Sequence, residues 1–95
     1  MTIAAMWTFE GATVEQYEEV FKLGGRAINE QPARLSHVCF PTSTGITVID
    51  VWTDEASFAA FGAIIGPATV QAGLLAPPAV YPVQGFMSAD GVRNP

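Results

Sequence analysis

Two residues of this sequence have side chains suited to proton chemistry: His37, its single histidine, and Asp50, an aspartate within an apolar run. Histidine titrates near neutral pH, so His37 is a candidate general base. A carboxylate among apolar neighbours needs hydrogen-bond donors, because burial of an unpaired charge is costly. A His–Asp pair would combine a base with its orienting acid. The alternative is a structural role for each residue. Asp50 would then be linked to Ser36 or Arg34, and the ring nitrogens of His37 would find hydrogen-bond partners in the core or in a dimer interface.

The register of a predicted hairpin decides whether these two side chains meet. If Pro41 faces Ile46, His37 lies directly opposite Asp50, with the two Cβ atoms about 4.5–5.5 Å apart. A register shifted by one residue places Asp50 opposite Ser36 and turns His37 to the other face of the sheet. The sequence leaves both registers open.

Aromatic residues are numerous enough to line a cavity for a flat apolar ligand. The candidates are Trp7, Tyr17, Phe21, Trp52, Phe58 and Phe61. Trp52 shares strand parity with Asp50, so both side chains are expected on the same side of the sheet. Tyr17 would add a hydroxyl group, which a buried tyrosine normally pairs. The competing interpretation is a plain hydrophobic core, where aromatics at helical spacing usually pack.

Other kinds of site find little support in the sequence. Cys39 would need an activating base and a lowered pKa to act as a nucleophile, and no oxyanion-type glycine motif accompanies it. One histidine, one cysteine and scattered carboxylates lack the spacing of a metal site. The glycine pair at 24–25 ends a predicted helix, so it is not a nucleotide-binding loop. We therefore expect neither a metal nor an organic cofactor.

The charge and composition of the chain limit the kinds of molecule that it is expected to bind. The chain has 95 residues, a net charge of −5 and four basic residues, which are spread along it. A basic patch for nucleic acid or for an anionic membrane surface cannot be built from these. No apolar run approaches the roughly 18 residues that suggest a membrane span. A single cysteine and the absence of a basic leader favour a cytoplasmic protein.

The order of the predicted elements indicates an α+β fold. The elements are a strand over 2–9, a helix after Thr13, strands over 34–40 and 45–52, a helix after Asp54 and a strand over 79–87. A polar connection is expected over 26–32, and a break or kink at Gly66-Pro67, with a short helical piece to Gly73. The β-α-β-β-α-β order predicts a ferredoxin-like, four-stranded antiparallel sheet with both helices on one face. Residues 1–87 would form this single domain and residues 88–95 a tail.

The predicted strands are apolar on both faces, which indicates a partner. Hydrophobic residues make up 49% of the chain and charged ones only 14%, against a typical charged share of about 25%. One layer of helices covers one face of a sheet, so the other face would remain a large exposed apolar patch. Pairing two such faces about a two-fold axis buries both. We therefore expect a homodimer that associates through its sheet faces.

The stretch from Val48 to Phe61 resembles the strand-to-helix signature of the dimeric α/β-barrel superfamily, and in particular small proteins related to the antibiotic biosynthesis monooxygenases. Residues 36–38 before a Pro-Thr hairpin, and the Gly, Pro and Ala positions within 65–78, are similar to one branch of that group. The resemblance covers residues 2–87. It implies a pocket between sheet and helices and a barrel where two sheets meet. The superfamily also contains lactone isomerases and haem-degrading enzymes, but a strand position for His37 argues against haem degradation.

These observations favour a cofactor-independent enzyme that abstracts a proton from an apolar or aromatic compound in a cavity between sheet and helices. His37 would be the base and Asp50 its partner. The cavity walls would be Trp7, Tyr17, Phe21, Trp52 and Phe61. An isomerase or cyclase would use the same proton transfer, and a non-catalytic dimeric binding module would use the same cavity.

Overall fold

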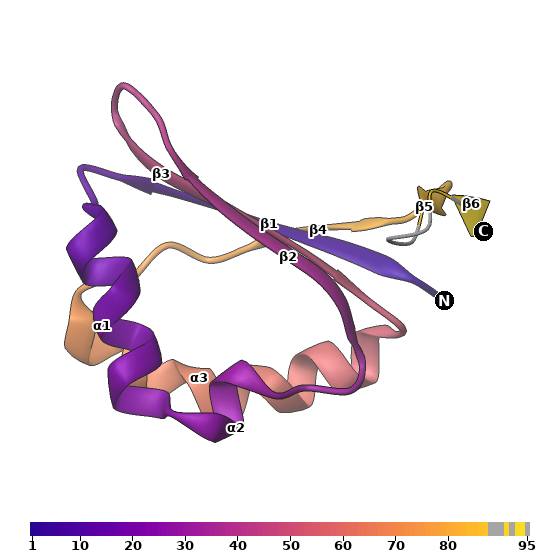
Figure 1. Cartoon of the computed structure of the whole chain (residues 1–95), viewed down its shortest axis with the longest axis horizontal. Helices are drawn as coiled ribbons and strands as arrows, with labels where there is room; N and C mark the ends of the chain where they lie inside the picture. Colours follow the sequence, from indigo (N-terminus) through magenta and orange to yellow (C-terminus); the bar gives the residue numbers. More distant parts are fainter. Residues whose placement is uncertain (88–90, 92, 95) are drawn as a thin grey trace.

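The computed structural model of the chain describes residues 1–87, 91 and 93–94. Its main elements are β1 (Ile3–Glu10), α1 (Val14–Gly24), α2 (Arg26–Asn29), β2 (Arg34–Pro41), β3 (Gly45–Trp52), α3 (Glu55–Ala72) and β4 (Ala79–Pro82). The strands form one antiparallel sheet in the order β2-β3-β1-β4. All three helices lie on the same side of this sheet (Figure 1). The predicted ferredoxin-like α+β fold is confirmed.

The first helix begins as the sequence predicts. The Thr13 hydroxyl accepts a hydrogen bond from the backbone N–H of Gln16 at 3.2 Å, and the Gln16 side chain accepts one from the backbone N–H of Thr13 at 2.9 Å. This reciprocal capping box satisfies two of the N–H groups that a helix start leaves unpaired. The helix ends at Gly24, where Gly25 adopts a positive φ of 57°. Val20 carries the buried face of α1 into the core.

The segment after α1 differs from the predicted polar connection. Residues 26–29 form the short helix α2, and the side chain of Ile28 is only 1% exposed. A Cβ atom built on Gly24 would overlap the Ile28 side chain, so the close approach of α1 and α2 requires glycine there. A single large apolar residue in a mostly polar segment has no periodicity, and the sequence pattern therefore missed this anchor.

Of the break or kink expected at Gly66-Pro67, the break is wrong, because α3 continues through Pro67 to Ala72. Proline inside a helix removes one hydrogen bond and costs about 3 kcal/mol. Tertiary packing offsets this cost, since Phe61 and Ala68 on either side of Pro67 are 2% and 7% exposed. The helix ends at Gly73, whose φ of 83° is the left-handed conformation that glycine adopts readily.

The last predicted strand, 79–87, is also shorter than expected. Strand β4 ends at Pro82, and β5 (Phe86–Met87) pairs instead with β6 (Arg93–Asn94) in a separate two-stranded sheet. Residues 88–90, 92 and 95 of the predicted tail lie outside the described residues. In the described part of the chain, no helix is long and apolar enough to cross a membrane.

The two faces of the sheet have different environments. Along β3, alternate residues are buried beneath the helices: Ile46, Val48, Asp50 and Trp52. The opposite face carries apolar side chains without a covering layer. The large exposed ones are Met6, Val38, Phe40 and Tyr81, at 36%, 49%, 41% and 55% exposure. The prediction that both faces of the sheet are apolar is confirmed.

Candidate functional site

The β2–β3 hairpin adopts the register in which Pro41 pairs with Ile46 and His37 with Asp50. Both side chains point toward the helices, and the Nδ1 atom of His37 lies 2.5 Å from Oδ1 of Asp50. The side chain of Asp50 is only 3% exposed, whereas that of His37 is 25% exposed. Of the two registers that the sequence allows, the structure therefore has the one that joins the histidine to the carboxylate.

The second carboxylate oxygen of Asp50 also accepts a hydrogen bond. The indole N–H of Trp52 donates to Oδ2 of Asp50 at 3.2 Å. Each carboxylate oxygen thus has one donor, and among the described residues no buried side-chain nitrogen or oxygen lacks a partner. Because Asp50 accepts from Nδ1–H of His37, the neutral imidazole has its lone pair on Nε2. Asp50 therefore fixes the orientation and the tautomer of His37.

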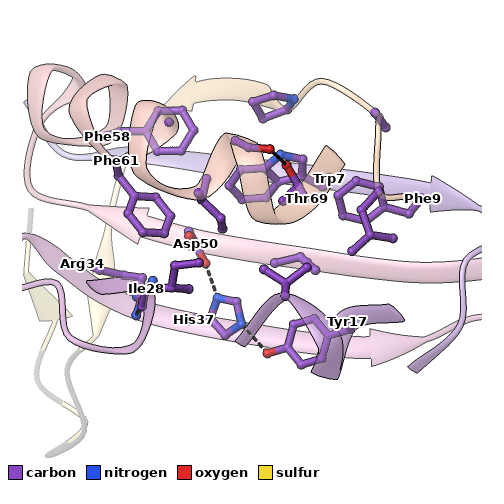
Figure 2. Close-up of a pocket in the computed structure, with 18 of the residues that line it drawn as sticks. Trp7, Phe9, Tyr17, Ile28, Arg34, His37, Asp50, Phe58, Phe61 and Thr69 are labelled. Atoms are coloured by element: carbon purple, nitrogen blue, oxygen red, sulfur yellow. Dashed lines mark hydrogen bonds and ion pairs between the residues drawn. The ribbon is translucent and has the colours of Figure 1, made fainter. Parts of the chain in front are cut away.

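The hydroxyl group of Tyr17 on α1 completes a chain of hydrogen bonds. It lies 2.6 Å from Nε2 of His37, and the two rings stack with an interplanar angle of 13°. Burial, followed by the charges of Cys39 and Glu18, raises the pKa of Tyr17 to about 12. The hydroxyl is therefore protonated at neutral pH and donates to Nε2. Figure 2 shows the resulting chain, in which His37 bridges Tyr17 and Asp50.

This chain of hydrogen bonds borders a cavity of about 300 Å³ between the sheet and the helices. Six of the seven residues that the sequence analysis proposed line it: Trp7, Tyr17, Phe21, His37, Asp50 and Phe61. Further apolar lining comes from Phe9, Ile28, Phe58 and Leu74. Phe21 packs edge-on against both the Tyr17 ring and the His37 ring, with centroids 4.9 and 5.9 Å apart. The polar chain is thus bordered by aromatic and aliphatic side chains.

Trp52 is the proposed wall residue that does not line the cavity. It is fully buried, its ring centroid lies 4.9 Å from that of Phe61, and its indole nitrogen faces Asp50. Strand parity placed it on the correct side of the sheet. Its position at the end of β3, under α3, makes it a support for the carboxylate.

The cavity exists because α3 has small residues where it faces the pocket. Ala59, Gly62, Gly66 and Thr69 all line the cavity. A Cβ atom added to Gly62 or Gly66 would have no other atom within 4 Å. Larger side chains at these positions would occupy the space that a ligand needs. The spacing of these small residues along one helix face is a sequence signal for the cavity, although Gly66 taken alone predicts only a helix break.

Arg34 also lines the cavity, although the sequence suggested it only as a structural partner of Asp50. Its Nη2 atom donates to the backbone carbonyl groups of Ile28 and Asn29, at 2.9 and 3.1 Å. The guanidinium carbon lies 5.4 Å from the ring centroid of Phe61 and 5.8 Å from that of Trp52. No ion pair joins Arg34 to Asp50 among the described residues.

Cys39 shares the inner face of β2 with His37 and is half-buried. Burial and the nearby charge of Glu18 raise the pKa of the thiol, which keeps it protonated and poorly nucleophilic. Within the described residues, no group of three His, Cys, Asp or Glu side chains is placed to hold a metal ion. The Tyr17–His37–Asp50 chain of hydrogen bonds is suited to proton transfer.

Comparisons with known proteins bear on the fold. No known family profile matches the chain, and no curated protein sequence matches it significantly. Among solved structures, it is similar to SnoaB, a cofactor-independent oxygenase from Streptomyces nogalater, with a TM-score of 0.59 and 21% identity over 87% of this chain and 91% of that one. A candidate antibiotic biosynthesis monooxygenase from Chloroflexus aurantiacus J-10-fl gives a TM-score of 0.56 and 18% identity, over 90% and 94% of the two chains. The chain thus has the ferredoxin-like fold of these proteins, in agreement with the resemblance seen in the sequence.

The raised pKa of Tyr17 predicts an alkaline titration that can be assigned. Tyrosinate absorbance of the folded protein should show a step near pH 12, which is absent in Tyr17→Phe and retained in Tyr81→Phe. Because this pKa lies above the ordinary value of about 10, the contribution of Tyr17 to stability is complete below pH 10 and is lost as the pH rises toward 12. A step lost near pH 10 in Tyr17→Phe would contradict the burial of the Tyr17 hydroxyl that raises this pKa.

Filling the cavity from α3 should weaken ligand binding without unfolding the protein. We expect Gly62→Leu to lower the affinity for a fused-ring probe such as 2-naphthol by about tenfold or more, since the added side chain enters open space in the cavity wall. Ala63→Leu is the matched control, because Ala63 is exposed and does not line the cavity. Fluorescence titration measures the affinity, and equal affinities in the two variants would place the binding site elsewhere.

Proposed function

We propose that this protein is a cofactor-independent enzyme that abstracts a proton from a small aromatic compound and promotes its reaction with dioxygen. The observation that carries this proposal is the Tyr17–His37–Asp50 chain, which meets an apolar cavity of about 300 Å³. The similarity in fold to SnoaB, itself a cofactor-independent oxygenase, supports the reaction class by analogy.

Proton transfer follows from the order of the hydrogen bonds. The Tyr17 hydroxyl oxygen accepts the proton of a substrate hydroxyl or an activated C–H while its own proton passes to Nε2 of His37. Tyr17 thus ends unchanged, His37 becomes an imidazolium and the substrate becomes an anion. Asp50 stabilises the imidazolium at 2.5 Å, and Trp52 holds the carboxylate in place. His37 is therefore the base and Tyr17 its relay, in contact with substrate.

The protein would next favour reaction of the substrate anion with dioxygen. An electron-rich enolate or phenolate can transfer one electron to dioxygen, and the resulting radical pair can combine into a carbon-bound peroxide anion. This anion takes the proton back from His37 and loses water, which leaves a carbonyl group on the ring. One oxygen atom of dioxygen thus enters the product and the other leaves as water, with all electrons supplied by the substrate. The cavity contributes by orienting the anion and by keeping water away from it. Its aromatic lining from Trp7, Phe21 and Phe58 suits a flat ring system.

We further propose that two copies of the chain pair through the outer face of the sheet. Met6, Ile49 and Val38 lie side by side across β1, β3 and β2, and Tyr81 of β4 extends this apolar surface. Burial of such a surface contributes roughly 25 cal/mol per Å² of apolar area. The cavity lies on the opposite face of the same strands and stays accessible in this dimer.

A charge on the outer face should prevent dimer formation. We expect Val38→Asp to sediment as a monomer at micromolar concentration where the unaltered protein sediments as a dimer, because the carboxylate would be buried without a partner. Val70→Asp is the control, since Val70 is 65% exposed on α3, away from this face. A monomeric unaltered protein, or a dimeric Val38→Asp variant, would contradict the proposed interface.

Oxygen uptake with a dihydroxynaphthalene tests the proposed reaction. After subtraction of autoxidation, we expect His37→Ala to lower the rate by about 10²–10⁴-fold, the usual contribution of a general base. Tyr17→Phe should also lose most of the activity, because it removes the relay. Thr47→Ala, on the outer face of β3, should keep it.

Three outcomes would overturn parts of this proposal. An unchanged rate in His37→Ala would remove His37 from the mechanism. A rearranged product without oxygen uptake would point to an isomerase or cyclase that uses the same proton transfer. Tight binding of aromatic compounds without any turnover would indicate a non-catalytic binding module.

A further inference from the structure

Arg34 occupies a fixed position at one end of the cavity. It is the first residue of β2, next to an irregularity in the strand pairing between Arg34 and Ser36. Two hydrogen bonds from its Nη2 atom anchor it to the last carbonyl groups of α2. The plane of the group is also held near the rings of Trp52 and Phe61. The guanidinium is therefore immobilised by neutral groups, and none of these contacts neutralises its charge.

The two charged side chains that line the cavity, Asp50 and Arg34, differ in whether their charge has a partner. Among the described lining residues, Asp50 carries the carboxylate and Arg34 the permanent positive charge. Asp50 already has two donors, His37 and Trp52. In the described part of the chain, Arg34 makes no ion pair, and its side-chain hydrogen bonds to Ile28 and Asn29 both come from Nη2. The remaining N–H groups of a half-buried guanidinium are thus suited to an oxygen anion, which they can bind through two parallel hydrogen bonds.

The position of Arg34 relative to the proton-transfer chain defines where such an anion would lie. Figure 2 shows Arg34 and Tyr17 on opposite sides of the His37–Asp50 pair, so a ligand in the cavity can reach both. A ring system that spans the cavity would place one oxygen at Arg34 and present its acidic hydroxyl to Tyr17. The low polarity of the surrounding lining strengthens the attraction between the guanidinium and an anion.

We propose that Arg34 makes the cavity selective for aromatic compounds that bear an oxygen anion, either a carboxylate or a phenolate. This inference rests on the cavity of the proposed function but not on turnover. Arg34 binds the oxygen at the end of the ligand away from Tyr17. When the ligand loses its proton to His37, the guanidinium adds to the imidazolium in stabilising the negative charge of the ligand.

Binding of matched ligand pairs tests this proposal without measuring catalysis. The first pair is 2-naphthoate and its neutral isostere 2-naphthamide. The second is 4-nitrophenolate, in mildly alkaline buffer, and 4-nitroanisole, which separates phenolate from carboxylate as the preferred anion. Calorimetric titration of the unaltered protein should give at least about tenfold tighter binding of one anion than of its neutral partner, equivalent to about 1.4 kcal/mol.

Variants then assign the preference to Arg34. Arg34→Gln, which keeps an amide donor for the α2 carbonyl groups but removes the charge, should bring each anion within about twofold of its neutral partner and leave binding of the neutral ligands unchanged. Arg34→Lys should keep part of the preference. Arg26→Gln is the control, because Arg26 is an exposed arginine that pairs with Glu30 on the surface.

Equal affinities for anion and neutral ligand in the unaltered protein would overturn the proposal. An Arg34→Gln variant that melts at a lower temperature and loses the same factor of affinity for both ligands of a pair would also overturn it. That result would be expected of a purely structural arginine. If Arg34→Gln does not fold, Arg34→Lys decides, because an ammonium keeps the charge but cannot form two parallel hydrogen bonds: an anion preference equal to that of the unaltered protein contradicts binding by the guanidinium. Anion preference without oxygen uptake would support this inference while contradicting the proposed reaction.

Discussion

A carboxylate buried between a sheet and its helices is the feature around which this structure is organised. The Asp50 side chain can remain charged at 3% exposure only if donors surround it, and the fold supplies them from an adjacent strand and from the same strand. The need for these donors places His37 opposite Asp50 and turns the Trp52 indole inward. Tyr17 then pairs with the nitrogen of His37 that Asp50 leaves free. The requirement to satisfy one buried charge thus generates a chain of four polar groups.

The cavity beside these hydrogen-bonded groups results from the absence of large side chains on part of α3. A helix so uniformly apolar would ordinarily fill the space above the sheet, and Phe61 does so near one end. Farther along the same helix, Gly62 and Gly66 contribute no side chain, so the space stays open and borders the polar chain. Close packing around Trp52 and open space around His37 are therefore produced by one helix. The packed part holds Asp50 in place, and the open part leaves a cavity beside it.

The sequence predicted the order of the elements because its signals were local and repeated. The Thr13–Gln16 capping box and the apolar alternation of β3 each leave a clear pattern. Ile28 left none, being one large apolar residue in a mostly polar segment. Pro67 predicts a helix break that does not occur, because packing of α3 on the sheet overrides its local preference. For the site, the residue types identified His37 and Asp50, but the register that joins them depends on hairpin geometry. The role of Arg34 depends on the carbonyl groups of α2, a helix that the sequence pattern did not reveal.

The turn between β2 and β3 has a consequence for how this chain can vary. The hydroxyl of Thr42 accepts hydrogen bonds from the backbone N–H groups of Thr44 and Gly45, and the N–H of Thr42 donates to the Gly45 carbonyl, which fixes the length of the turn. On β2, residues that face the cavity alternate with residues that face the outer surface, so one inserted or deleted residue would move His37 to the outside and bring Val38 inside. Relatives that keep the His37–Asp50 pair should therefore differ freely by substitution at residues 43 and 44, keep the hydroxyl of residue 42, and change the length of the turn only in steps of two.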